Sequence, residues 1–322
     1  MTSKDKIREL KQIIKLNLQK LVSNQVAIFG LPTHGNIGDT LISIGELEFL
    51  KDIGVECIYI RLLLDDNPKL PKLPKDCTIL FQGGGDFGDV WRKIHENRLK
   101  IISNYPNNNI IIFPQSVHYN DNNLLIHDAK FLSKFKNLTI CARDGFSFDI
   151  LSKNFRNKIL LIPDMAFYIP IQISLNKFKT SSKPHLYLKR TDKEGVNLTD
   201  LNIDNADISD WPTIKNDLWQ IKIVFKLIGL AAAFRIRRIF IVEKLLHHIT
   251  SYYTIKWLYP HILKIGTEFI TKYEHLTLTR LHSAILATLL DKEFYLIDNA
   301  YGKNHNFYNT WLHNLETAHI YN

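Results

Sequence analysis

The sequence predicts an α/β protein built from two Rossmann-like halves that face a central cleft. Three features indicate this architecture. Apolar, strand-like runs alternate with helical stretches, which is typical of parallel sheets covered by helices on both faces. Two glycine-rich turns follow apolar runs, at 32–40 and 81–89. A polar, irregular stretch at 170–184 separates two α/β halves. Such halves place a ligand cleft at the carboxyl ends of both sheets.

The first half is expected to be a domain covering residues 1–170. Apolar spacing predicts a helix over 4–22. Strands are predicted at 25–30, 57–62, 78–82, 109–113, 138–143 and 159–162, with helices at 40–50 and 90–104. Asp39 stands directly before the helix at 40–50, so we expect it to be the N-cap.

The second half is expected to be a domain covering residues 185–322. Its first strand is predicted at 185–189, and the acidic stretch 192–216 is predicted as a loop. One or two long helices are expected over 218–252. The remaining elements are strands at 276–279 and 293–297 and a helix at 283–290.

Composition narrows the class of protein. The 322 residues suffice for two domains of ordinary size. The net charge of +9 favours anionic partners, but the basic residues are dispersed, so nucleic acid is not expected. Cys57, Cys77 and Cys141 lack metal-binding spacing and are expected to be buried free thiols. The charged stretch 1–20 does not resemble a signal peptide, so we expect a cytoplasmic protein.

The two glycine-rich turns are candidate ligand contacts. Glycine is needed where φ is positive or where a ligand approaches bare backbone, and N–H groups at a helix start attract anions. Both turns carry an aspartate, Asp39 or Asp86. The alternative is a tight structural turn, but three consecutive glycines would be entropically costly there. The residues of the two turns that are expected to line the cleft are Gly35, Asn36, Gly38, Gly83, Gly84 and Gly85.

Arg280 and His282 flank a predicted strand-to-helix junction. Arginine grips a carboxylate or phosphate through two hydrogen bonds, and histidine transfers protons near neutral pH. The alternative is an arginine paired with an interface carboxylate and a capping histidine. Arg143 and Arg190 also follow apolar strands, so with Arg280 they would neutralise an anion of two or three charges.

Two further stretches leave alternatives open. The run 298–304, DNAYGKN, follows the last predicted strand, and its Asn299 and Lys303 could bind a hydroxyl or phosphate or belong to a polar turn. The stretch 221–260 is apolar, basic and rich in aromatics. It could lie on an anionic membrane surface or pack in a core or a homo-oligomer. Its charges interrupt any run long enough to span a bilayer.

Together the motifs GNIGD, QGGGxFGD, ARD, KRxD, RLHSAI and DNxYGKN, in this order between Gly35 and Asn304, resemble the polysaccharide pyruvyl transferase family. The resemblance implies a two-domain fold similar to B-type glycosyltransferases. It also implies transfer of a pyruvyl group from phosphoenolpyruvate to two hydroxyls of a sugar, which forms a cyclic ketal. The acceptor would be a bacterial surface polysaccharide or its lipid-linked precursor. Ser283 departs from the family, which often has glycine there.

The resemblance assigns the donor site to Arg143, Arg190, Arg280 and His282. Phosphoenolpyruvate carries a carboxylate and a phosphate, so its pocket needs two or three cations. The reaction needs an acid, for which His282 is the candidate, and a base, for which Asp39 or Asp86 is the candidate. Phosphoenolpyruvate is a co-substrate, and neither a cofactor nor a metal is expected.

Two other functions remain as alternatives. A nucleotide-sugar glycosyltransferase of the same fold would use the glycine turns and arginines to hold a pyrophosphate. A non-catalytic glycan-binding protein could keep the fold without the reaction, although the Arg280 and His282 pair favours catalysis.

Overall fold

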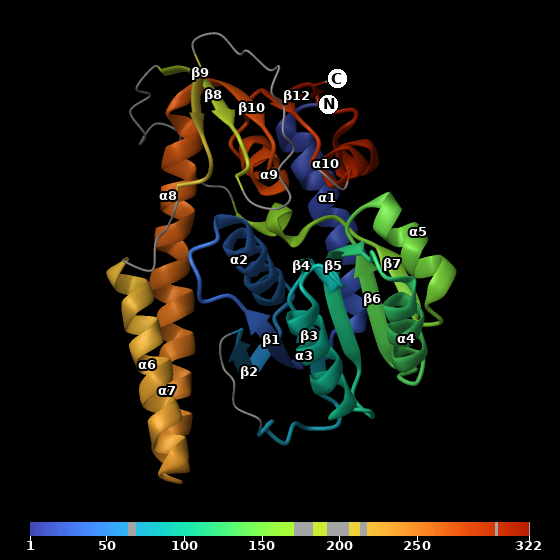
Figure 1. Ribbon diagram of the computed structural model, residues 1–322, viewed down its shortest axis with the longest axis vertical. Coiled ribbons are helices and arrows are strands. Elements are labelled where there is room, and N and C mark those ends of the chain that lie inside the picture. The colour runs from blue at the N-terminus through green and yellow to red at the C-terminus, as the bar shows by residue number, and fades with distance from the viewer. Residues whose placement is uncertain (64–68, 171–182, 192–205, 213–217, 300–301, 322) are drawn as a thin grey trace.

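The computed structural model describes residues 1–63, 69–170, 183–191, 206–212, 218–299 and 302–321. Two parallel sheets form the molecule (Figure 1). Most of the predicted stretch between the two halves, 170–184, lies outside the described residues.

The larger sheet has the strand order β2-β1-β3-β5-β6-β7, with β4 paired to β5. All its pairings are parallel, as the alternating pattern predicts. Its strands are β1 (Gln25–Leu31), β2 (Glu56–Leu62), β3 (Thr78–Phe81), β4 (Gly84–Gly88), β5 (Ile110–His118), β6 (Leu138–Ala142) and β7 (Lys158–Leu161). Its helices are α1 (Ser3–Leu18), α2 (Ile37–Asp52), α3 (Arg92–Ser103), α4 (Asn122–Leu132) and α5 (Gly145–Asn154), with 3-10 turns η1 (Gln19–Leu21) and η2 (Met165–Tyr168).

The smaller sheet has the strand order β12-β11-β10-β8-β9 and is also parallel. Its strands are β8 (Lys183–Leu188), β9 (Ala206–Ser209), β10 (Tyr273–Leu278), β11 (Phe294–Leu296) and β12 (Ala318–Ile320). The helical elements that follow β9 are α6 (Trp219–Ile236), α7 (Phe240–Tyr253), the π-helical turn η4 (Thr254–Leu258), α8 (Tyr259–Thr271), α9 (Leu281–Leu289), α10 (Lys303–Phe307) and the π-helical turn η5 (Tyr308–Leu312).

The structure corrects two predictions about the strands. Part of the stretch predicted as a loop, 192–216, is the edge strand β9, which has mixed polarity because it lies at the sheet edge. Part of the second glycine-rich turn is the strand β4. Gly88 is required there, because it has a φ of 124° and a Cβ atom would lie 1.9 Å from the carbonyl oxygen of His118.

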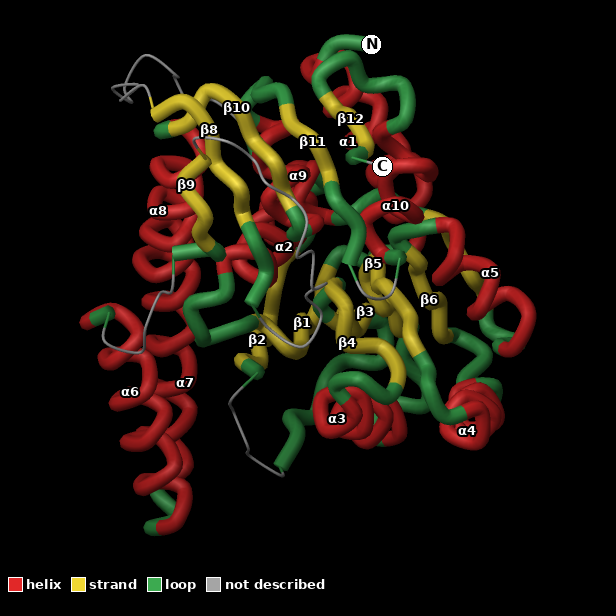
Figure 2. The backbone as a smooth tube through the Cα atoms, turned by 45° about the horizontal axis from the view of Figure 1, so that its top comes forward, coloured by secondary structure: helices red, strands yellow, loops and turns green. Residues whose placement is uncertain are grey.

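The two sheets share one continuous core, and Figure 2 shows α2 and α9 lying between them. Apolar residues of β1 and α2 and of β8, β10 and β11 belong to the same buried cluster. The helix α2 packs against η2, α8 and α9, and α1 packs against α9. Because α2 and α9 begin where strands of different sheets end, this packing brings the carboxyl ends of both sheets together. None of the helices in the described part of the chain combines the length and hydrophobicity needed to cross a bilayer.

Candidate active site

A cavity of about 430 Å³ lies between the carboxyl ends of the two sheets. Its lining comes from segments that follow strands of both sheets, among them β1, β3, β4, β6, β8, β9, β10 and β11. Every site residue proposed from the sequence except Gly35 lines it. These residues are Asn36, Gly38, Asp39, Gly83, Gly84, Gly85, Asp86, Arg143, Arg190, Arg280, His282, Asn299 and Lys303.

The first glycine-rich turn leads into α2 at the edge of the cavity. Asn36, and not Asp39, is the N-cap, because its Oδ1 accepts the N–H of Gly38 at 2.8 Å. The predicted cap was therefore wrong, and α2 begins three residues earlier than expected. Asp39 instead lies in the first turn with its side chain about one third exposed, and its Oδ2 is 3.7 Å from His34 Nε2.

The three glycines of the second turn serve different purposes. At Gly83 a Cβ atom would lie 2.7 Å from the carbonyl oxygen of Pro114, and Gly84 has a φ of 136°. These two positions need glycine for packing and for backbone conformation. At Gly85 a Cβ atom would lie 3.4 Å from Arg143 Nη2 and 3.6 Å from Lys303 Nζ. Only Gly85 therefore leaves room next to two cations.

A buried glutamate of α2 supports this turn. Glu46 is fully buried, and its Oε1 accepts the N–H of Gly83 at 2.7 Å. Burial raises the pKa of Glu46 well above its ordinary value, the Gly83 hydrogen bond lowers it, and Asp164 and Asp86 raise it further. Folding therefore shifts the equilibrium of Glu46 toward its neutral form.

This arrangement predicts a pH-dependent effect of Glu46→Gln. Because folding raises the pKa of Glu46, its neutral form stabilises the folded state below its unfolded pKa, and this contribution is lost as the pH rises through the folded pKa. Glutamine does not titrate and keeps an acceptor for Gly83. The Tm of the variant relative to wild type should therefore increase between pH 5 and pH 8.5. Glu48→Gln in the same helix is the control, and an equal pH response of both variants would contradict the prediction.

Arg143, Asp164 and His282 form a connected group in the cavity wall. The Oδ2 atom of Asp164 lies 2.9 Å from Arg143 Nη1 and 3.4 Å from His282 Nε2. Burial alone would raise the pKa of Asp164, but its contact with His282 and the charges of His282 and Arg143 lower it to about 2. Asp164 is thus a buried carboxylate held between a strand-end arginine and a histidine of the other sheet.

His282 also packs on the first glycine-rich turn. A Cβ atom at Gly38 would lie 2.5 Å from His282 Nδ1, so only glycine leaves space for the ring. His282 is in the first turn of α9, whose N-cap is Arg280. The turn between β10 and α9 therefore carries both residues into the cavity, as their spacing predicts.

Arg280 is paired with a carboxylate of its own half. Its Nε and Nη2 atoms donate to the two oxygens of Asp210 at 2.5 and 2.7 Å. Burial raises the pKa of Asp210, but the hydrogen bond and charge of Arg280 lower it overall. Asp210 also accepts the N–H and hydroxyl of Thr191, next to Arg190. A paired arginine is the alternative given above, although Asp210 belongs to the same half as Arg280, and Arg280 itself lines the cavity.

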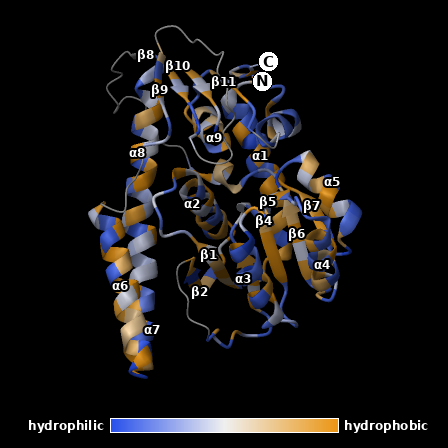
Figure 3. Cartoon of the chain, viewed as in Figure 1, coloured by the Kyte–Doolittle hydropathy of each residue, from blue (hydrophilic) through white to orange (hydrophobic). Residues whose placement is uncertain are grey.

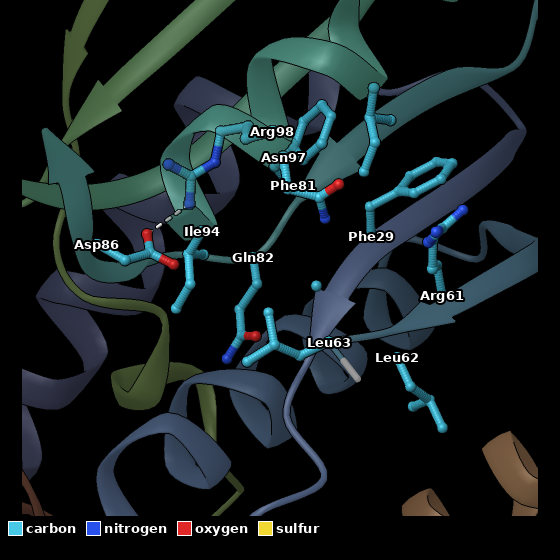
Figure 4. Close-up of a pocket in the computed structure, with 12 residues that line it drawn as sticks. Phe29, Arg61, Leu62, Leu63, Phe81, Gln82, Asp86, Ile94, Asn97 and Arg98 are labelled. Atoms are coloured by element: carbon cyan, nitrogen blue, oxygen red, sulfur yellow. Dashed lines mark hydrogen bonds and ion pairs between the residues drawn. The ribbon is translucent and has the colours of Figure 1, made fainter. Parts of the chain in front are cut away.

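Asp86, the second candidate base, is also paired with an arginine. It forms an ion pair with the buried Arg98 of α3, and Figure 4 shows the two side chains pointing toward each other. Asp86 lies between the large cavity and the smaller one of Figure 4, which Phe29 and Phe81 also line. The Asp86 carboxylate is already engaged by Arg98, whereas the Asp39 carboxylate is about one third exposed at the cavity. Asp39 is thus the better placed of the two candidate bases.

Several residues of this site were not predicted from the sequence. Asp164 and Asp210 are the carboxylates paired with Arg143 and Arg280, and Trp91 and Trp211 are among the other residues that line the cavity. One signal for Asp164 was available, because Pro163-Asp164 directly follows a predicted strand. Asp210 follows β9, which the sequence pattern did not reveal.

Comparison with known proteins places this arrangement in a family. The sequence model of the polysaccharide pyruvyl transferase family matches residues 36–273. The putative pyruvyl transferase EpsO of Bacillus subtilis is 31% identical over 326 residues, which cover 99% of this chain and 96% of that protein.

This chain belongs to the polysaccharide pyruvyl transferase family. The family and the transferase activity expected from the motifs are thereby confirmed. Pyruvyl transferase 1 of Schizosaccharomyces pombe is 27% identical to the transferase, over 90% of this chain and 70% of the yeast protein. A crystal structure of a functionally uncharacterised Klebsiella pneumoniae protein superposes with a TM-score of 0.63. That match covers 97% of the transferase and 98% of the other chain at 19% identity, so it shows a shared fold alone.

Proposed function

We propose that the transferase moves the pyruvyl group of phosphoenolpyruvate to two hydroxyls of one sugar, forming a cyclic ketal. The acceptor is a surface polysaccharide or its lipid-linked precursor, and the reaction takes place in the cytoplasm. The observation that carries the proposal is the convergence of Arg143 and Lys303 on Gly85, in the same cavity as His282.

Charge supports a small donor with two anionic groups. Arg143 follows a strand of the larger sheet, whereas Arg190, Arg280 and Lys303 follow strands of the smaller sheet. A carboxylate and a phosphate on adjacent carbons would span such a cluster, because each anion could meet cations from both sheets. The N-terminus of α9 adds positive potential beside His282.

The proposed reaction assigns its proton transfers to His282 and Asp39. His282 protonates the methylene carbon of phosphoenolpyruvate, which becomes a methyl group and leaves C2 with oxocarbenium character. Asp39 takes the proton of the first sugar hydroxyl as its oxygen bonds to C2. The C2–O bond to phosphate then breaks, and inorganic phosphate leaves with the bonding electron pair. The second hydroxyl adds to C2 and passes its proton to His282, which restores the acid. Asp164 stabilises positive charge on the His282 ring.

Other residues of the cavity lining suit the acceptor. Trp91 and Trp211 offer apolar surfaces for a sugar ring, and Asn36 and Asn299 offer side-chain hydrogen bonds. In this proposal residues 1–170 and 185–322 act as two domains arranged as in B-type glycosyltransferases. The support for it is that two parallel sheets direct their carboxyl ends toward one cavity.

Donor binding tests this function. Isothermal calorimetry should show binding of phosphoenolpyruvate, and phosphoenolpyruvate should raise the Tm, because the cavity presents several cations to a dianionic or trianionic ligand. Uridine diphosphate and nucleotide sugars should do neither. Binding of a nucleotide diphosphate without binding of phosphoenolpyruvate would instead indicate the glycosyltransferase alternative.

Gly85→Ala tests where the donor lies. Gly85 does not have a positive φ, and an added methyl would meet only ordinary contact distances, so the fold should not change. The methyl would occupy the space beside Arg143 and Lys303 and should weaken phosphoenolpyruvate binding about 10-fold or more, through lost charge-assisted hydrogen bonds. Gly229→Ala, in open space on α6, is the matched control. Unchanged donor affinity in Gly85→Ala would place the donor elsewhere.

A further inference from the structure

The helices α6 and α7 form a hairpin that stands away from both sheets. Figures 1 and 2 show the two helices side by side, with their far end beyond the edge of the larger sheet. They pack mainly against each other, and α7 also contacts the edge strand β2. We call residues 235–241, which connect the two helices, the hairpin tip. The chain reverses there, and Arg238 has a φ of 60°.

The hairpin exposes an unusual amount of apolar surface. Ten of the eighteen large apolar side chains that the described residues leave exposed lie between Trp219 and Trp257. At the tip, Ile236 and Ile241 are 83% and 84% exposed, and Phe240 is 50% exposed. Figure 3 shows apolar residues reaching the far end of the hairpin. Apolar residues on all faces of a helix are typical of apolar surroundings, which the rest of the described chain does not provide here.

The same hairpin is strongly basic. Between Trp219 and Trp257 the sequence has seven lysines and arginines against one acid, Glu243. That acid is paired with Arg235 at 3.0 Å. This segment accounts for a surplus of six positive charges, against +9 for the whole chain. At the tip, Arg237 and Arg238 lie in the exposed turn between Ile236 and Ile241. Apolar and basic side chains thus alternate at the most exposed point.

A second cavity beside the hairpin repeats this combination. It measures about 750 Å³ and lies between α7, β2 and the segment 69–72. Its lining is largely apolar, with Ile58, Ile60 and Phe240 among the residues. Four lysines also line it: Lys69, Lys72, Lys244 and Lys256. Apolar surface bordered by lysines suits an amphiphile with an anionic headgroup.

We propose that the α6–α7 hairpin docks on an anionic lipid bilayer, with the tip inserted among the headgroups. Ile236, Phe240 and Ile241 would enter the headgroup and acyl boundary, and Arg237 and Arg238 would contact lipid phosphates. Charge complementarity favours an anionic bilayer over a second copy of the chain as the partner of the hairpin, because two equally basic hairpins would repel each other. This inference does not depend on the donor or on the reaction proposed above.

Vesicle flotation tests the docking. The purified transferase should float with vesicles of phosphatidylcholine and phosphatidylglycerol at low salt, and much less with pure phosphatidylcholine or at high salt, because screening weakens surface electrostatics. The double variant Ile236→Ser/Ile241→Ser should bind the vesicles at least about 10-fold less tightly. The reason is that serine, unlike isoleucine, gains no favourable free energy when its side chain moves from water into the apolar part of the membrane. The matched control is Ile126→Ser/Ile208→Ser, which removes two exposed isoleucines outside the hairpin and should bind like wild type.

A second variant separates charge from hydrophobicity. Arg237→Gln/Arg238→Gln keeps the apolar tip and should lower binding to anionic vesicles about 30-fold, with a shallower salt dependence. Sedimentation equilibrium of the same proteins measures their oligomeric state and so tests whether a second copy of the chain binds the hairpin instead. Absence of flotation at low salt overturns the proposal, as does equal binding by wild type and both tip variants. A dimer that dissociates in Ile236→Ser/Ile241→Ser without vesicle binding would identify a second copy and also overturn it.

Discussion

His282→Gln should lower kcat by about 10³-fold while phosphoenolpyruvate still binds, because a positioned acid typically contributes 10²–10⁴-fold. Glutamine keeps a side chain over Gly38 but cannot donate the proton in the same way. Asp164 would keep Arg143 as a partner at 2.9 Å, so the fold should hold. Single-turnover kinetics with the acceptor sugar and calorimetry with phosphoenolpyruvate would measure the two effects separately.

Two further variants sharpen this test. His319→Gln, on β12 outside the cavity, is the control and should be fully active. Asp164→Asn should lower kcat less than His282→Gln and should shift the pH profile of kcat, because it removes the carboxylate beside the His282 ring. Turnover of His282→Gln at the wild-type rate would show that another group supplies the proton.

Arg280→Ala should weaken phosphoenolpyruvate binding about 100-fold or more, because it removes a guanidinium able to form two charge-assisted hydrogen bonds. Arg280→Lys should recover only part of the affinity, since lysine lacks the planar guanidinium group that donates two parallel hydrogen bonds. Calorimetry measures both, and Arg8→Ala, an exposed position on α1, is the control.

The pairing of Arg280 with Asp210 allows a direct test of whether this role is only structural. If Arg280 binds the donor, Asp210→Asn should retain or strengthen donor binding, because it removes a competing negative charge from the site. If Arg280 serves only to hold Asp210, the two variants should lose donor binding together. That second outcome would exclude Arg280 from the donor site.

The sequence predicted which side chains would meet because parallel strands direct their carboxyl ends to one edge. Arg143, Arg190 and Arg280 each follow a buried strand, so the topology alone brings them to one cavity. Their donor-binding roles stay predictions. The partners of these residues were not visible, because Asp164 and Asp210 reach them through tertiary packing and not through sequence spacing.

At several positions the local sequence fits more than one structure. Asn36 and Asp39 are both good N-caps, and only the geometry of the turn shows that Asn36 accepts the N–H of Gly38. The strand β9 has no apolar alternation that would distinguish it from a loop. For 218–252 the sequence predicts one or two long helices, but it does not say whether their apolar residues face a core or solvent.

The contacts of His282 and of Arg280 depend on different parts of the structure. Arg280 pairs with Asp210, and both residues follow strands of the smaller sheet. His282 instead packs against Gly38 of α2 and lies beside Asp164, and both of these residues follow strands of the larger sheet. The position of the His282 ring is therefore set by the packing of the two sheets against each other, whereas the pair of Arg280 and Asp210 is held beside one sheet alone.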